Sequence, residues 1–377
     1  MYDCIVVGSG LAGSSLATVL SRQGWHVLLL ERRHLPQHKV CGEFLSPEAQ
    51  AILGGLGLYD TVAHLHPATM DMARLTTPAG LHLHVQLPGQ AWGVSRFALD
   101  AALLAAAAEA GATVRTGITV TGTTPTSSGH IVAARCGQDQ LTFTARAVVV
   151  ACGRNPVPAL RPVPDAPRPT IAQTHIGVKC HYTNLAMPPQ VELYLFPGGY
   201  VGLSPVEDGR ANLCLLTTHA AFTAAGASAE AMLAAVCHWN QALARRLQEG
   251  TFLPDTQVTV ASVDLKQRAV PWNGVARVGD AVTMIPPLCG DGMAMALRSA
   301  QLCAPLAHDF LRGACSLAGW EEHYRRQWHR TFDPAMRVGR MLQAALIQPG
   351  VHDMLLLLGN ILPPLARTAV HTTRATR

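Results

Sequence analysis

The sequence predicts an α/β fold that carries a second, antiparallel sheet and ends in a helical segment. Three features predict it: a strand, glycine turn and helix at the N-terminus, short turn-separated strands in the middle, and apolar runs broken by glycine and proline at the end. At about 150 residues per domain, a chain of 377 residues has room for two or three domains.

The composition excludes several classes of protein. Charged residues make up 14% of the chain, against about 25% in typical globular domains, and hydrophobic residues make up 49%, which excludes a disordered chain. The net charge of +5 comes without dense Lys/Arg blocks or interleaved aromatic residues, so we expect no nucleic-acid partner. The ten cysteines have no C-x-x-C spacing, and no signal peptide or apolar stretch of about 18 residues is visible. These features predict reduced thiols in a cytoplasmic protein.

The N-terminus has the pattern of a dinucleotide-binding strand–helix–strand unit. An apolar run over residues 2–7 leads into the motif Gly8-x-Gly10-x-x-Gly13, a helical stretch follows, and a second apolar run ends at Glu31. Gly8 permits a tight turn, Gly10 lets the backbone approach a pyrophosphate, and Gly13 lets helix and strand pack closely. Glu31, next to Arg32, lies where a carboxylate accepts hydrogen bonds from ribose hydroxyls. The pattern predicts a Rossmann-like domain and leaves NAD and FAD open.

A second glycine motif lies far along the chain. The pair Gly279-Asp280 is followed by Pro286-Pro287, and then by Gly290, Gly292 and Met293 at the start of a helical stretch. With these residues the sequence resembles FAD-dependent oxidoreductases of the aromatic-hydroxylase (group A flavoprotein monooxygenase) and geranylgeranyl-reductase superfamily. The resemblance implies FAD as the cofactor and a glutathione-reductase type of FAD-binding domain. Asp280 then accepts a hydrogen bond from a ribityl hydroxyl, the helix start at Gly290, Gly292 and Met293 faces the flavin, and Pro287 stiffens the turn beside the ring.

Two further segments resemble this superfamily, and one departs from it. Arg96, in a segment similar to the family's Arg-x-x-Leu-Asp, is expected near the flavin phosphates or ribityl chain; a surface cation is the alternative. The loop from Lys39 to Glu43 is similar to one in the reductase-like branch, and we do not assign Cys41 as a nucleophile because no base lies beside it in the sequence. Cys152 stands where the family's middle motif has an acid, which puts the docking of NAD(P)H in doubt.

The middle of the chain is predicted to form a sheet inserted into the cofactor domain. We expect the FAD-binding domain over 1–74, 94–168 and 262–330, the sheet domain over 75–93 and 169–261, and a C-terminal helical segment over 331–377. In this sheet, Tyr194, Phe196 and Tyr200 are the predicted substrate contacts, with sheet core as the alternative. The apolar end of the chain is expected to pack on the body; the alternative is an apolar lip with basic residues that rests on a membrane.

The leading functional hypothesis is an FAD-dependent monooxygenase that uses NAD(P)H and dioxygen to hydroxylate an apolar aromatic substrate, such as a polyketide phenol or an alkylresorcinol. This substrate rests on the resemblance alone. One alternative is a geranylgeranyl-reductase-like enzyme that saturates isoprenoid double bonds, and another is a flavin-binding protein without turnover. No catalytic side chain is assigned. The histidine pairs 64/66 and 82/84 lack a third nearby ligand, so no metal site is expected.

Overall fold

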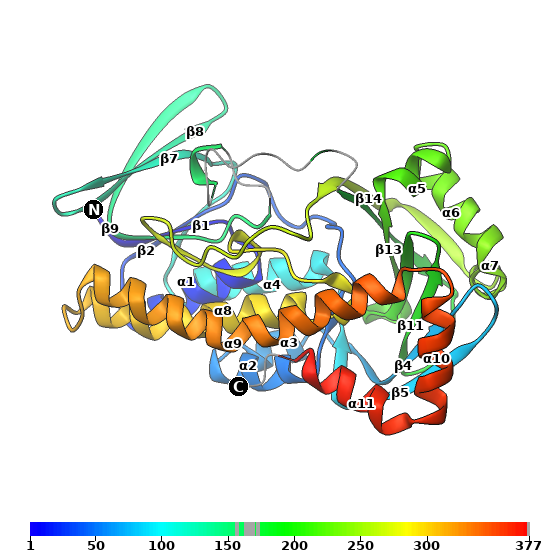
Figure 1. The fold of residues 1–377 in the computed structure, drawn as a ribbon. Coiled ribbons are helices and arrows are strands. Elements are labelled where there is room, and N and C mark those ends of the chain that lie inside the picture. The colour runs from blue at the N-terminus through cyan, green and yellow to red at the C-terminus, as the bar shows by residue number, and fades with distance from the viewer. Residues whose placement is uncertain (155–157, 162–169, 171–173, 375–377) are drawn as a thin grey trace.

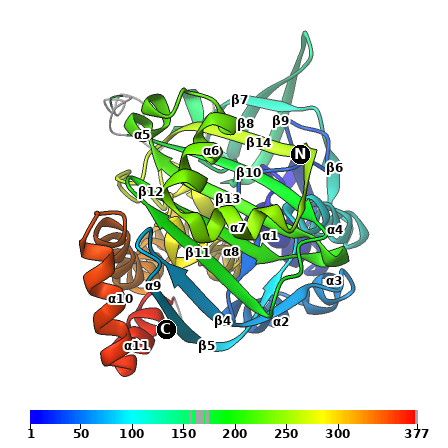
Figure 2. The same ribbon diagram turned by 90° about the vertical axis from the view of Figure 1, so that its right-hand side faces the viewer.

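The computed structural model describes residues 1–154, 158–161, 170 and 174–374, and it contains two sheets at opposite ends of the molecule (Figure 1, Figure 2). The first sheet has seven strands, and β1 lies between β2 and β9, in parallel with both. The expected strand–helix–strand unit is therefore present. In order across the sheet the strands are β6 (Thr113–Arg115), β2 (Val27–Leu30), β1 (Tyr2–Val7), β9 (Asp139–Val150), β8 (Gly129–Cys136) and β7 (Thr119–Thr126), with β15 (Ala276–Arg277) beside β9.

The second sheet has eight strands, and its neighbours are antiparallel except for β11 and β4, which are parallel. One strand begins earlier than expected: residues 68–74, assigned to the cofactor domain from the sequence, are part of β4 in this sheet. The expected boundary at residues 168 and 169 lies outside the described residues. The order is β14 (Thr251–Val263), β10 (His175–Thr183), β13 (Ala211–Thr218), β12 (Gly199–Pro205), β11 (Gln190–Phe196), β4 (Ala68–Thr76), β5 (His82–Gly93) and β3 (Phe44–Leu45).

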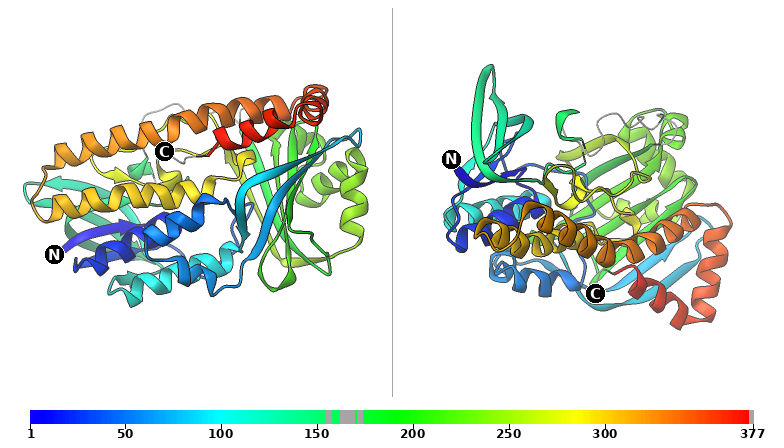
Figure 3. Two further views of the ribbon diagram at one scale, coloured as in Figure 1. Left: turned by 90° about the horizontal axis from the view of Figure 1, so that it is seen from below. Right: turned by 60° about the vertical axis from the view of Figure 1, so that its left-hand side comes forward.

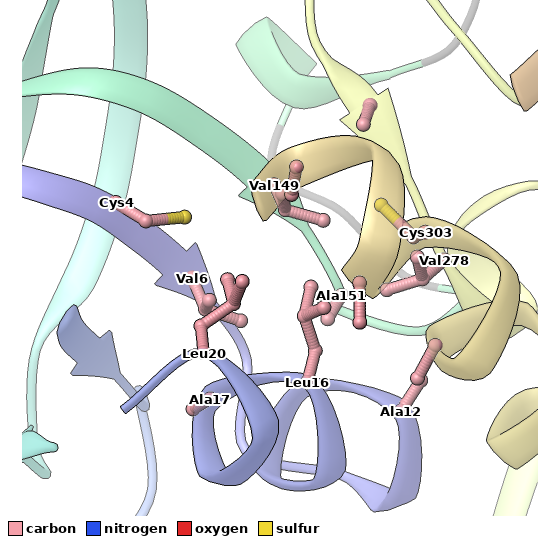
Figure 4. Packing of buried hydrophobic residues seen from close by; sticks show 14 of the residues in the cluster. Cys4, Val6, Ala12, Leu16, Ala17, Leu20, Val149, Ala151, Val278 and Cys303 are labelled. Carbon is pink, nitrogen blue, oxygen red and sulfur yellow. The ribbon is translucent and has the colours of Figure 1, made fainter. Parts of the chain in front are cut away.

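Three helices pack against one another on one face of the first sheet: α1 (Leu11–Arg22), α4 (Arg96–Glu109) and α8 (Gly292–Leu311). Leu16 and Leu20 of α1 point toward Val6 and Val149 of the sheet (Figure 4), and all four side chains are fully buried. The shorter α2 (Glu48–Gly55) and α3 (Tyr59–Ala63) lie beside α8 and α4. On the outer face of the second sheet lie α5 (His219–Ala224), α6 (Ala229–Trp239) and α7 (Gln241–Gln248) (Figure 2).

One long helix runs from one end of the molecule to the other (Figure 3). Helix α9 (Leu317–Leu346) begins in the core of the first sheet and ends beside the second, so the boundary expected between residues 330 and 331 falls inside it. Helices α10 (Val351–Ile361) and α11 (Pro363–Thr372) then pack against β5. No single helix in the described part of the chain is long and apolar enough to cross a membrane, and α9 with α10 meets that criterion only as a pair bent by 114°.

The first helix approaches the sheet so closely that only glycine fits at two positions. Gly8 has a φ of +104°, and a Cβ there would lie 2.5 Å from the carbonyl oxygen of Ala151. A Cβ on Gly13 would lie 1.9 Å from the carbonyl oxygen of Gly8. This close packing places the N-terminus of α1 directly over the ends of β1 and β9.

We predict that Gly13→Ala lowers the free energy of unfolding by about 1–3 kcal/mol, because the added methyl group overlaps backbone that cannot move freely. The measurement is denaturant unfolding of the purified protein. Gly54→Ala in α2 is the matched control, since a Cβ there meets nothing within 4 Å, and it should be neutral or slightly stabilising. Equal stability of the two variants would contradict the prediction.

Candidate functional site

A cavity of about 600 Å³ lies at the carboxyl ends of the parallel strands β1, β2 and β9. Ligands of open α/β sheets bind at such strand ends. The structure brings six of the predicted cofactor residues together around this space, which we call the polar cavity: Gly8, Gly10, Glu31, Arg32, Arg96 and Asp280. Cys152, which replaces the acid of the middle motif, also lines it.

The glycine turn forms an open cradle at the start of α1. A Cβ on Gly10 would meet only the Arg96 side chain, at 3.9 Å, so the backbone there is accessible from the cavity. Gly10 is the N-cap residue of α1, and no side chain caps this helix. Its first backbone N–H groups and the positive end of the helix dipole therefore suit a pyrophosphate. The cavity thus fits the phosphate-bearing half of a dinucleotide.

Glu31 is held in place at the end of β2 by the glycine turn itself. One carboxylate oxygen, Oε2, accepts hydrogen bonds from the Ser9 backbone N–H at 2.9 Å and from the Ser9 hydroxyl at 3.0 Å. The other, Oε1, accepts one from the Arg33 N–H at 3.0 Å. These bonds fix a nearly buried carboxylate on the cavity wall, at the position expected for ribose recognition.

Two partly buried cations surround a buried carboxylate beside the cradle. Arg96 donates two hydrogen bonds to Asp100, at 2.8 and 2.9 Å, and the Lys39 ammonium lies 2.5 Å from the same carboxylate. Burial alone would raise the pKa of Asp100, but Arg96 and Lys39 outweigh it and hold that pKa below its usual value. With two cations around one carboxylate, this wall has a positive excess that favours an anionic ligand. The alternative of a surface position for Arg96 is therefore wrong.

Asp280 closes the polar cavity from the second motif. It lies in the short turn Gly279–Ala281 that follows β15. Burial raises its pKa, while Arg154 and Arg96 act in the opposite direction. Gly279 itself does not line the cavity; its role is close packing, since a Cβ there would lie 3.2 Å from the Cβ of Ala12.

The remaining residues of the second motif lie around a second, apolar cavity of about 390 Å³. Pro287 and Gly290 line it, Gly292 begins α8, and Met293 is buried in the neighbouring core. Val40, Arg154 and Val260 line both cavities, so the two spaces adjoin. An elongated dinucleotide bound at the glycine cradle can extend toward this junction. Both glycine motifs therefore serve one continuous site.

The apolar cavity contains weak acids and lacks bases. Among the described residues, its charged lining residues are Arg154 and Arg374, and neither a carboxylate nor an imidazole lines it. Its ionisable neutral groups are the thiols of Cys41, Cys214 and Cys289 and the phenol of Tyr200. Burial raises the pKa of each of these four groups, to about 11 for Cys289, and raises that of Tyr200 well above its usual value. All four are protonated at neutral pH.

Two of the three predicted substrate contacts lie on the face of the second sheet that is turned away from the apolar cavity. Tyr200 on β12 lines the apolar cavity, but Tyr194 and Phe196 on β11 pack against α6 and α7. The Tyr194 hydroxyl donates to Glu192 at 2.7 Å, and Phe196 stacks on Trp239. Side chains alternate along a strand, so the cavity face of β11 carries the residues that alternate with Tyr194 and Phe196, of which Val191 and Leu193 line the cavity. The prediction of Tyr194 and Phe196 as substrate contacts is corrected accordingly.

Sequence reasoning missed a buried cluster at the junction of the two sheets. The Glu43 carboxylate lies 2.6 Å from His181 Nε2 and 3.2 Å from Lys179 Nζ, and it accepts a hydrogen bond from the Arg96 N–H at 2.9 Å. Lys179 Nζ also lies 3.1 Å from His38 Nδ1, on the wall of the polar cavity. Burial first, and then Lys179 and His181, lower the pKa of His38 to about 4. The cluster ties the loop that carries Cys41 to β10.

The only local signal for this cluster was Lys179-x-His181, because two polar residues at this spacing share one face of the buried strand β10. Its partner Glu43 lies more than 130 residues away in the sequence, at a separation of 138 from His181. No local pattern connects these positions. Among the described residues, no group of three His, Cys, Asp or Glu side chains is placed to hold a metal ion.

Comparison with curated proteins finds relatives along most of the chain. A digeranylgeranylglycerophospholipid reductase of Methanopyrus kandleri is 25% identical over 351 residues, which cover 88% of this chain and 83% of the relative. A squalene monooxygenase of Rattus norvegicus is 45% identical over a shorter stretch of 64 residues, 17% of this chain and 11% of the relative.

Solved structures share the whole fold. The flavin-dependent brominase Bmp2 superposes with a TM-score of 0.82 at 18% identity, covering 100% of this chain and 94% of its own. A geranylgeranyl bacteriochlorophyll reductase-like protein of Thermoplasma acidophilum superposes with a TM-score of 0.79 at 20% identity, covering 100% and 96%. At these identities the likeness concerns the fold, which confirms the expected Rossmann-type domain with an added sheet and C-terminal helices.

A family model described as FAD binding domain matches residues 1–318. These include both glycine motifs and the residues Val40, Arg154 and Val260, which line both cavities. The glycine cradle and the positive wall beside it are the features that such a family needs for its cofactor. The chain therefore belongs to the FAD-binding domain family, and it is an FAD-dependent oxidoreductase of the superfamily that its two motifs resemble.

Proposed function

We propose that this enzyme uses its bound FAD to saturate carbon–carbon double bonds of an isoprenoid lipid held in the apolar cavity, with NAD(P)H as the transient reductant. FAD supplies hydride transfer when it is bound at the junction of the cavities. The observation that carries the proposal is the lining of the apolar cavity, which is mostly hydrocarbon side chains and includes three thiols and a phenol, with Arg154 and Arg374 as its charged residues.

The acid–base character of this lining favours reduction. Adding hydrogen across a double bond requires a hydride donor and a proton donor, and the cavity lining offers protonated thiols and a phenol as proton donors. Hydroxylation of a phenol calls instead for a base that takes the phenolic proton. Neither a carboxylate nor an imidazole lines the apolar cavity within the described residues.

The relatives support the substrate class. The name of the Methanopyrus protein gives it a digeranylgeranyl lipid, and the name of the rat protein gives it squalene; both are isoprenoids. An isoprenoid chain is a flexible hydrocarbon, and it gains from burial against the leucine-rich lining roughly in proportion to the area removed from water. Because the sequence has one glycine fingerprint of the dinucleotide type, we propose that NAD(P)H binds only transiently.

Oxygen insertion into an apolar aromatic or an alkene is the second candidate. The apolar lining that excludes water from the cavity supports it, because oxygen-transferring flavoenzymes need a dry site. Dioxygen would then be a co-substrate. A flavin-binding protein without turnover is the remaining alternative.

We expect the FAD-loaded protein to oxidise NADPH or NADH without oxygen when a geranylgeranyl lipid is supplied in detergent micelles. Mass spectrometry should find one added hydrogen molecule per saturated double bond, since reduction needs no dioxygen. Strict dependence on oxygen, with an oxygen atom in the product, would favour the second candidate. Failure of either nucleotide to reduce the flavin would favour a protein without turnover.

We predict that Cys41→Ala slows this reaction by about 100-fold or more, the usual contribution of a placed proton donor. Cys41 lines the apolar cavity next to Val40, which lies at the junction with the polar cavity. Cys237→Ala is the matched control, because this thiol lines a separate cleft on the outer face of the second sheet. Steady-state turnover and FAD content are measured together; unchanged turnover in Cys41→Ala would remove this thiol from the mechanism.

We also propose that this is a cytoplasmic enzyme that rests on a membrane surface through α10 and α11. All ten cysteines are free thiols, as expected in a reducing compartment. The outer face of α10 exposes Met354 (61%), Leu357 (49%) and Ile361 (72%), none of which lines the apolar cavity. The basic side chains of Arg337, Arg340 and Arg367 are exposed nearby in the chain and suit anionic lipid headgroups.

We expect the protein to co-sediment with vesicles that contain anionic lipid, and the double variant Leu357→Ser/Ile361→Ser to lose most of this binding because it removes apolar area from the contact. Ile131→Ser, at an exposed position on β8, is the control and should bind like the parent protein. Equal binding of both variants would place the membrane contact elsewhere or exclude it.

A further inference from the structure

The C-terminal helices α10 and α11 form one wall of the apolar cavity. Four residues of α10 and four of α11 line the cavity, and all eight are Leu, Ala, Val or Gly. We call this pair of helices the C-terminal wall. It lies at the edge of the second sheet, beside β5 and β4 (Figure 2). Its inner side faces the cavity, and its outer side exposes apolar residues as well.

Few polar contacts attach this wall to the rest of the molecule. In α10, the Asn360 amide donates to the carbonyl oxygen of His82 on β5 at 2.9 Å. Beyond α11, the chain turns inward, so that Thr373 and Arg374 are buried although α11 itself has no buried residue. Arg374 forms an ion pair with Asp291 and lies 3.4 Å from the carbonyl oxygen of Cys289.

The partner of Arg374 belongs to the second glycine motif. Asp291 is the N-cap residue of α8, between Gly290 and Gly292. The side chains of Arg374 and Asp291 are only 4% and 1% exposed. Loss of either charge would be costly, because the remaining one would be buried without a partner of opposite charge. The ion pair therefore exists only while the end of the chain is docked.

We propose that Arg374 is a positioning residue whose ion pair with Asp291 latches the C-terminal wall onto the start of α8, and that release of this latch opens the apolar cavity. In water, burial of the wall's leucine side chains stabilises the docked wall, but this packing is not directional and does not specify where the end of the chain lies. The buried ion pair is directional and is present only in the docked state.

The proposed latch is compatible with either reaction considered above, since both need water to be excluded from the apolar cavity. The latch also lies beside the second glycine motif, because Arg374 contacts both Cys289 and Asp291 in the segment from Cys289 to Gly292. Arg374 does not line the polar cavity, so the latch is separable from cofactor binding at the glycine cradle.

The test measures access to the cavity in the FAD-loaded protein without substrate. N-ethylmaleimide is applied, and the labelling rate of each cysteine is followed by peptide mass spectrometry. Cys41, Cys214 and Cys289 line the cavity and report on its opening. Exposed Cys136 reports on reagent activity, and Cys303, which is fully buried in the core of the first sheet, reports on unfolding.

We expect Arg374→Gln to speed labelling of the three cavity thiols by about tenfold or more, because breaking a buried pair favours the undocked wall. Arg374→Lys keeps the charge and should restore slow labelling in large part. Arg367→Gln on the exposed side of α11 is the matched control and should label like the parent. Parent-like rates in Arg374→Gln would overturn the proposal. Faster labelling of Cys303 as well would also overturn it, since Arg374 would then act on global stability.

Discussion

The contact on which the rest of this structure depends is the close approach of α1 to the ends of β1 and β9. It exists because Gly8 and Gly13 have no side chains: a Cβ on either would overlap the backbone of Ala151 or of Gly8. The approach points the uncapped N-terminus of α1 at the polar cavity and places Glu31 and Arg96 on its walls. A larger residue at Gly13 would push the helix away from the sheet, and the cradle would lose its geometry.

The site has two halves with opposite physical character. The polar cavity has glycine backbone, a fixed carboxylate and a positive wall, which suit phosphates and ribose. The apolar cavity beyond Val40, Arg154 and Val260 has hydrocarbon walls and protonated weak acids. FAD has the same two halves, an ADP part and a flavin ring. On the proposed function, the junction is the place where the cofactor meets the hydrocarbon substrate.

Buried charge clusters hold the two halves together. Glu43 receives contacts from Lys179 and His181 of the second sheet and from the start of α4 beside the first. Arg374 and Asp291 join the end of the chain to the start of α8. Such pairs add little net stability compared with apolar packing, but loss of one partner is costly. They therefore specify how the loop at Cys41 and the C-terminal wall are placed, where apolar contacts alone would allow several arrangements.

The sequence by itself determined the cofactor half of this protein. Both glycine motifs, Glu31 at the strand end and Asp280 in the second turn depend on local spacing, and local spacing is readable because backbone geometry over a few residues follows from residue type. The second sheet was also predictable from alternation, although β4 begins at Ala68, earlier than its pattern indicated.

Tertiary structure decided the apolar half of the site. Alternation defines two faces of β11 without telling which one meets the cavity. Tyr194 and Phe196 were therefore assigned to the wrong face, whereas Tyr200 on β12 lines the apolar cavity and stays a predicted substrate contact. The pairs Glu43–His181 and Asp291–Arg374 join residues 138 and 83 positions apart. No local rule connects such positions, because what brings them together is the packing of whole elements.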